Sequence, residues 1–156
     1  MSSTVRPERS AAPNAERVQI DPRGPRFAAT LTTVVLAVAL AASPSALTEV
    51  LLAVQVVVFA IGAVAGIQHT PYAWLFRTLV RPRLGKPTEL EDAAPPRFAQ
   101  GVGLAFGVVA LAGYLLGLDL LGAVAAGFAL AAAFLNAAFG FCLGCEVYLL
   151  GKRLTT

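Results

Sequence analysis

The stretch 120-LLGAVAAGFALAAAFLNAAFGF-141 contains no charged residue, and Asn136 is its only strongly polar side chain. A helix rises about 1.5 Å per residue, so about 20 apolar residues cross the hydrocarbon core of a bilayer, which is about 30 Å thick. In lipid the backbone must satisfy its own hydrogen bonds, which favours a helix. Three further runs of this kind lie at 27–43, 47–66 and 98–117. We therefore predict an all-α protein, a four-helix transmembrane bundle.

The composition supports a membrane protein with little else attached. Mean hydropathy is +0.72 and 13% of the residues are charged, whereas soluble domains average about 25%. The membrane domain is expected over 18–153, with the fourth span extending towards residue 150 if its helix is continuous. Residues 1–17 are polar and rich in Ser, Ala and Pro, and we expect them to form a disordered N-terminal segment.

The positive charges predict an orientation in the membrane. All twelve Lys and Arg residues lie before the first span, between the second and third, or after the fourth. The other two loops, SPSA at 43–46 and GLDL at 117–120, contain none. The positive-inside rule then places both termini and the middle loop in the cytoplasm. Nucleic-acid binding is excluded as an interpretation, because the arginines are scattered and no binding motif accompanies them.

The loop between the second and third spans contains a predicted helix, and the segments that precede the first and third spans are similar to each other. Pro71 can begin a short helix in which aromatic residues alternate with arginines, a composition typical of a helix lying on the cytoplasmic leaflet. The segment 25-PRFAATL-31 is echoed by 96-PRFAQGV-102, and each precedes a helical hairpin. This similarity suggests that the two hairpins are parallel repeats. In such a repeat, 66-GIQHTP-71 would be equivalent to 140-GFCLGCE-146.

Cys142 and Cys145 are the only cysteines, and three functional interpretations apply to them. As a redox pair, Cys142 would be the attacking thiol and Cys145 the resolving thiol. On an unbroken fourth helix the dipole would oppose a thiolate, and so would Glu146. If Gly140 breaks the helix, Cys142 begins a short final helix and the dipole favours the thiolate instead. The sequence leaves both possibilities open, although a permanent structural disulfide is not expected in a reducing compartment.

The alternatives are metal binding and packing. Cys142, Cys145 and His69 could supply three ligands to a metal, but a lone CxxC is weak support, and we expect neither metal nor cofactor. In the packing interpretation, the cysteines are small residues in a helix contact and the protein is a non-enzymatic scaffold or small permeation subunit. No charge lies near the centre of any span, which disfavours proton-coupled transport. The sequence is compatible with a homo-oligomer and does not decide whether the protein is an enzyme.

Three segments resemble a bacterial integral membrane family, domain of unknown function 4395. They are 21-DPRGPRFAA-29, 95-PPRFAQGVG-103 and 141-FCLGCEVYLL-150, and the resemblance extends from Ile20 to Leu150. It implies a bacterial inner membrane protein without an established activity. Association of such proteins with thioredoxin-like and sulfur-transfer proteins favours a redox role and a partner of that kind. The match to the family is loose at Thr70 and Pro71, to which we assign no role. The residues that match the family's motifs are Cys142, Gly144, Cys145, Tyr148, Arg26, Phe27, Arg97 and Phe98.

Arg26 and Arg97 each precede a phenylalanine at the entrance of a span. Such arginines could hold a lipid phosphate or an anionic sulfur substrate. Anchoring of the span at the membrane surface explains them nearly as well.

Overall fold

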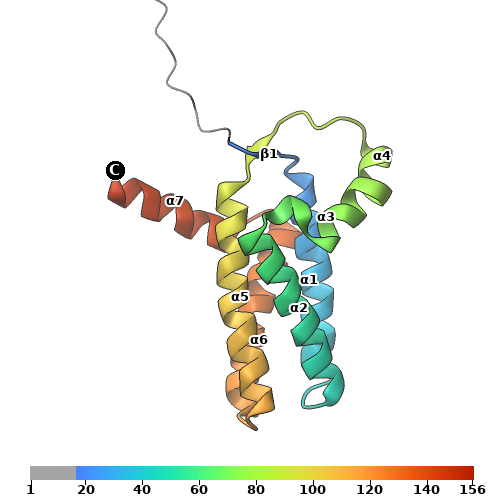
Figure 1. Cartoon of the computed structure of the whole chain (residues 1–156), viewed down its shortest axis with the longest axis vertical. Coiled ribbons are helices and arrows are strands. Elements are labelled where there is room, and N and C mark those ends of the chain that lie inside the picture. Colours follow the sequence, from blue (N-terminus) through green and yellow to red (C-terminus); the bar gives the residue numbers. More distant parts are fainter. Residues whose placement is uncertain (1–16) are drawn as a thin grey trace, which may run out of the picture.

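The computed structural model describes residues 17–156, and helices account for most of them. Four long helices form a bundle in which the chain runs alternately up and down (Figure 1). They are α1 (Arg23–Ala41), α2 (Ala46–Val64), α5 (Ala94–Leu115) and α6 (Asp119–Phe139). Each is long and apolar enough to cross a membrane. The predicted all-α fold with four long apolar helices is confirmed, while the expectation for 1–17 falls almost wholly outside the described residues.

The bundle core is built from small and branched apolar side chains. Leu36, Leu52 and Ala110 are almost completely buried within one cluster. Near the loop that joins α5 to α6, a Cβ atom on Gly113 would lie 2.7 Å from the backbone nitrogen of Gly122. Only glycine permits the two helix backbones to approach this closely.

The outward faces of the four helices are apolar as well. A soluble bundle would place polar side chains there, so this surface fits lipid better than water. Exposed examples from the four helices are Val34, Val57, Phe106 and Phe128.

Short elements gather at one end of the bundle, where α1 and α5 begin and α2 and α6 end (Figure 1). We call this the basic end, because every described Lys and Arg belongs to the segments that meet there. After α2 come a 3₁₀ turn, η1 (Ile67–His69), then α3 (Pro71–Leu75), a π-helical turn, η2 (Phe76–Val80), and α4 (Arg81–Leu84). The predicted helix beginning at Pro71 is therefore present. After α6 comes α7 (Leu143–Thr155), which projects sideways from the bundle (Figure 1).

Two strands that the sequence did not predict connect the entrances of the two hairpins. β1 (Gln19–Ile20) and β2 (Glu91–Asp92) pair antiparallel, with Ile20 opposite Glu91. Directly afterwards, Asp21 Oδ1 accepts a hydrogen bond from the Arg23 N–H at 3.0 Å, and Asp92 Oδ1 accepts one from the Ala94 N–H at 2.9 Å.

The matching turns show that the two hairpins begin in the same way. Ile20 and Glu91 occupy equivalent positions in the two segments and pair with each other, as a local twofold relation between the hairpin entrances requires. The matching entrances support the suggested hairpin repeat, which stays a prediction for the rest of the chain.

Candidate functional site

The fourth apolar run does not continue as one helix. α6 ends at Phe139, and Gly140 has a φ of 67°, a left-handed conformation that favours glycine. The Gly140 N–H donates to Asn136 O at 2.9 Å, and the Phe141 N–H donates to Leu135 O at 3.3 Å, which closes the helix end. Cys142 is extended and caps α7. Of the two possibilities that the sequence left open, the structure has the break at Gly140.

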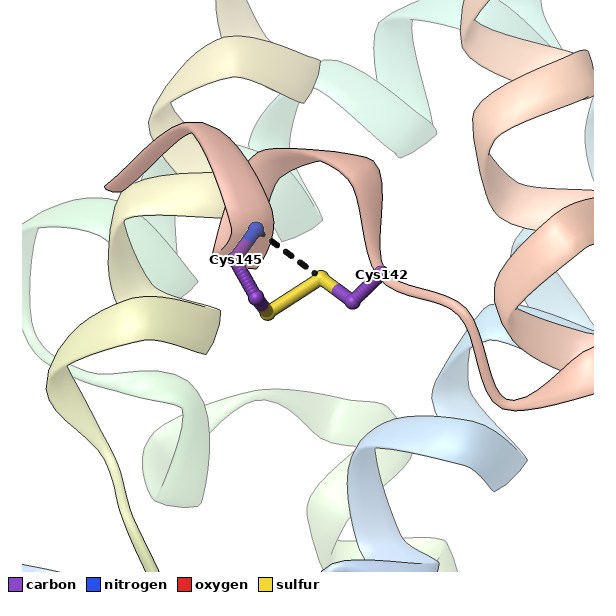
Figure 2. Close-up of a disulfide and its surroundings, with 2 residues drawn as sticks. All are labelled: Cys142 and Cys145. Carbon is purple, nitrogen blue, oxygen red and sulfur yellow. Dashed lines mark hydrogen bonds between the residues drawn. A yellow bond between two sulfur atoms is a disulfide. The ribbon is translucent and has the colours of Figure 1, made fainter. Parts of the chain in front are cut away.

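Cys142 and Cys145 are joined by a disulfide at the N-terminus of α7 (Figure 2). Their Cα atoms are 5.2 Å apart, well inside the usual range for a disulfide. The sulfur of Cys142 also accepts a hydrogen bond from the Cys145 N–H at 3.3 Å (Figure 2). One backbone N–H and the positive end of a 13-residue helix therefore point at this sulfur. Both groups favour a thiolate over a thiol in the reduced protein.

The helix that carries the cysteines is fixed to the start of α5. A Cβ atom on Gly144 would lie 2.6 Å from Ala99 Cβ, so only glycine allows α7 to sit this close. One turn further along, the ring of Tyr148 packs against Phe98 with centroids 5.7 Å apart. Gly144 and Tyr148 thus position the pair, whereas the Glu146 side chain is exposed in the first turn of α7.

Arg26 and Arg97 each donate hydrogen bonds to the C-terminal carbonyl groups of a helix in the other hairpin. Arg26 donates from Nε to Ala137 O at 3.1 Å and from Nη2 to Ala138 O at 3.2 Å, just before the break at Gly140. Arg97 donates in the same way to Ala63 O at 2.8 Å and to Val64 O at 2.7 Å. A cation here satisfies terminal carbonyls and complements the negative end of the helix dipole.

The geometry thus adds helix capping to the two interpretations of these arginines. Arg26 bonds to the end of α6, so it supports the segment from which the cysteines emerge.

The segment that follows α2, residues 66–76, resembles the segment that follows α6, residues 140–148, and we call each a joint. The first joint has no sulfur, and it contains the added turn η1 between its glycine and its cap. Gly66 has a φ of 114° after α2, as Gly140 has a positive φ after α6. Thr70 then caps α3, and its Oγ1 accepts from the Ala73 N–H at 3.2 Å, in the place of the Cys142 and Cys145 contact. Six residues after the cap, Phe76 packs on Phe27 at 5.9 Å, as Tyr148 packs on Phe98.

Thr70 was left without a role by the sequence. A threonine directly before a proline is a recognisable helix start, since proline suits the first helical position. That local signal could have identified the cap.

His69 lies in η1, within the joint of the first hairpin, whereas the cysteines lie in the joint of the second. Within residues 17–156, no three His, Cys, Asp or Glu side chains are grouped so that they could hold a metal ion. The structure therefore does not bring Cys142, Cys145 and His69 together as a metal site.

The family described as Domain of unknown function (DUF4395) matches residues 20–153. The chain belongs to this family. No curated protein and no solved structure matches it significantly.

Proposed function

We propose that this member of a family of unknown function is a multi-pass protein of the bacterial cytoplasmic membrane. We further propose that it has a thiol–disulfide site at its cytoplasmic face. The site is the pair Cys142 and Cys145 at the N-terminus of α7. The observation that carries the proposal is the joint of the first hairpin. It has a positive-φ glycine, a helix cap and an aromatic pair in the same order, with the turn η1 added and with Thr70 and Ala73 in place of the cysteines. The architecture therefore does not require sulfur, which favours chemistry over packing.

Placement in the membrane is supported by four long apolar helices with apolar outward faces. The basic end is expected in the cytoplasm by the positive-inside rule. That orientation puts the cysteine pair in a reducing compartment, where a disulfide is typically transient and catalytic or redox-sensing.

The pair can carry out a two-electron exchange. In the reduced protein, the Cys142 thiolate attacks one sulfur of a substrate disulfide, and the other substrate sulfur leaves as a thiolate. The Cys145 thiol loses its proton and attacks Cys142 Sγ, which forms the internal disulfide and releases the second substrate thiol. The substrate gains two electrons and the pair loses two.

A dithiol protein of the thioredoxin-like class would restore the reduced pair by the reverse exchange. One of its thiolates attacks the internal disulfide, and its second thiol then resolves the mixed disulfide. Such a protein, or a sulfur-transfer protein, is the proposed partner. Cys142 is assigned as the attacking thiol because its sulfur is the one that accepts the Cys145 N–H.

The test uses the full-length protein in detergent or nanodiscs under inert gas. We expect the pair to equilibrate with dithiothreitol buffers and to be half reduced above roughly −300 mV, as labile disulfides are. With a thioredoxin-like protein in its oxidised, disulfide form, the Cys142 thiolate of Cys145→Ser should attack that disulfide and be trapped in a mixed disulfide, whereas Cys142→Ser should not be trapped. A pair that stays oxidised far below that potential would contradict a redox role. Equal trapping by both variants would contradict the assignment of Cys142.

The matched control is the double variant Cys142→Thr with Cys145→Ala, which copies the joint of the first hairpin. It should keep the thermal stability of the bundle and lose all exchange. If this variant fails to fold, the cysteines are structural and the proposal is wrong. If it folds and preserves the cellular phenotype of the intact protein, the non-enzymatic scaffold is the better description.

A further inference from the structure

A shallow hollow of about 350 Å³ lies at the basic end, on the segment that follows α2. It is lined by Arg77, Arg81, Pro82, Gly85 and Lys86. Three of these five residues carry a positive charge, and none carries a negative one. The hollow belongs to the first hairpin repeat and is separate from the cysteine pair in the second.

No ion pair within residues 17–156 neutralises the cations of the hollow, although the carboxylate of Asp21, which is paired with Arg23, lies near enough to Arg81 for the two charges to attract. Among residues 17–156, ion pairs join only Arg17 to Asp92 and Arg23 to Asp21. No carboxylate pairs with Arg77, Arg81 or Lys86 in that part of the chain. Three unpaired cations around one depression make a site for an anion with several oxygen atoms, such as a phosphate.

Backbone contacts hold the walls of the hollow in place. Arg23 donates from Nη1 to Leu84 O at 3.3 Å and from Nη2 to Gly85 O at 3.1 Å, which fixes the end of α4 to the entrance of α1. Arg77 donates from Nη1 to Gln68 O at 2.6 Å, which orients its guanidinium group. The cations therefore project from a supported turn and not from a free loop.

Exposed apolar side chains accompany these cations on the same segment. Trp74, Leu79 and Leu84 are all at least half exposed, at 58%, 54% and 50%. Apolar and basic groups on one short helical segment fit the boundary between acyl chains and headgroups. A freely dissolved phosphate would use the cations alone and leave the apolar groups without a partner.

We infer that this hollow binds the phosphate of an anionic phospholipid, held by Arg77, Arg81 and Lys86 while Trp74 and Leu79 contact the acyl chains. The site would fasten the first hairpin to the cytoplasmic leaflet. The inference rests on the membrane placement under the proposed function but not on the chemistry of the cysteines. A protein with inert cysteines could still bind lipid here, so the two proposals fail separately.

The test measures binding of short-chain phosphatidylglycerol and phosphatidylcholine with the same acyl chains to the full-length protein in neutral detergent. Arg81→Gln with Lys86→Gln removes two cations of the hollow. Each cation near an anionic lipid contributes a factor of about five in affinity, so the double variant should bind phosphatidylglycerol roughly 25-fold more weakly. The control is Lys152→Gln with Arg153→Gln, which removes the same charge from the last turn of α7.

We expect the wild type and the α7 control to prefer phosphatidylglycerol and the hollow variant to lose that preference. Equal weakening in both double variants would refute a local site and indicate only net charge. Inorganic phosphate that competes as well as the lipid at equal concentration would also overturn the inference, since the hollow would then bind free phosphate. Both variants must retain the wild-type unfolding temperature without lipid, and Arg81→Lys should restore most of the binding lost in Arg81→Gln.

Discussion

Replacing Gly144 by alanine should loosen the helix that carries the cysteines. The added Cβ would lie 2.6 Å from Ala99 Cβ and 2.7 Å from Ala99 Cα. The second of these atoms is backbone, so no side-chain rotation relieves the clash, and α7 has to move away from α5. The same helix offers a matched control in Gly151, where an added Cβ meets nothing within 4 Å.

The size of the effect follows from the difference between the two variants. Both replacements reduce the conformational freedom of the unfolded chain and improve helix propensity by up to about 1 kcal/mol. Only Gly144→Ala adds overpacking, which typically costs about 1–3 kcal/mol. The gain in helix propensity is common to both variants, so the difference in stability between them measures the cost of overpacking at Gly144. At 1.4 kcal/mol per factor of ten, separation of α7 from α5 should become roughly 5- to 150-fold more frequent.

The assay is the rate at which dithiothreitol reduces the Cys142–Cys145 disulfide, followed by a mass shift with a maleimide. Both cysteines are partly buried where α7 meets α5, so opening of that contact should speed attack. We expect faster reduction in Gly144→Ala than in Gly151→Ala, by at least about fivefold. Equal reduction rates and equal unfolding temperatures in the two variants would show that Gly144 does not hold the site.

Two further predictions concern the entrances of the hairpins. Arg97→Gln and its counterpart Arg26→Gln each remove two hydrogen bonds to terminal carbonyls, so each should lower the free energy of unfolding by about 1–3 kcal/mol in detergent; a loss in only one of them would contradict the twofold relation. The hydrogen bond from Arg23 lowers the pKa of the Asp21 carboxyl below its usual 3.8. Stability from this pair is therefore full above about pH 3.8 and lost as the pH falls through the lowered pKa. Unfolding measured against pH should show this acid-side loss in the wild type and not in Asp21→Asn.

The four helices of the bundle could be predicted from the sequence because long apolar runs allow few alternative structures. A charge-free run such as 120–141 satisfies its backbone in lipid only as a helix, so length and hydropathy identify it. The helix termini shifted by a few residues, since local caps decide where a helix begins and ends. Ser45, for example, starts α2 by accepting the Thr48 N–H at 3.3 Å. The pairing of β1 with β2 was missed because strands of two residues have no periodicity to detect.

The position of the candidate site could be predicted from the sequence, but its geometry could not. The spacing of Cys142 and Cys145 and the flanking glycines indicated both a dithiol and a possible break. Which state holds depends on Gly140 adopting a positive φ, and a glycine permits that conformation without requiring it. The role of Arg26 was beyond reach for a different reason. Its acceptors, Ala137 and Ala138, lie more than a hundred residues away, and no local pattern in the sequence links them.

Two hairpins with matching contacts at their ends provide an internal comparison that a single hairpin lacks. What both halves share serves the architecture, as the two arginines at the helix ends and the two aromatic pairs do. What only one half contains is not needed to close the joint, because the other half closes it differently. By this reasoning the fold does not require the sulfur atoms of Cys142 and Cys145, since Thr70 caps the equivalent helix with a hydroxyl group. For the hollow this reasoning covers Arg77 alone, because Leu149 follows Tyr148 where Arg77 follows Phe76, whereas Arg153 occupies the position equivalent to Arg81. The proposed thiol chemistry thus belongs to the second hairpin alone, and placing Thr and Ala at positions 142 and 145, as at Thr70 and Ala73 of the first hairpin, should remove it and leave the fold intact.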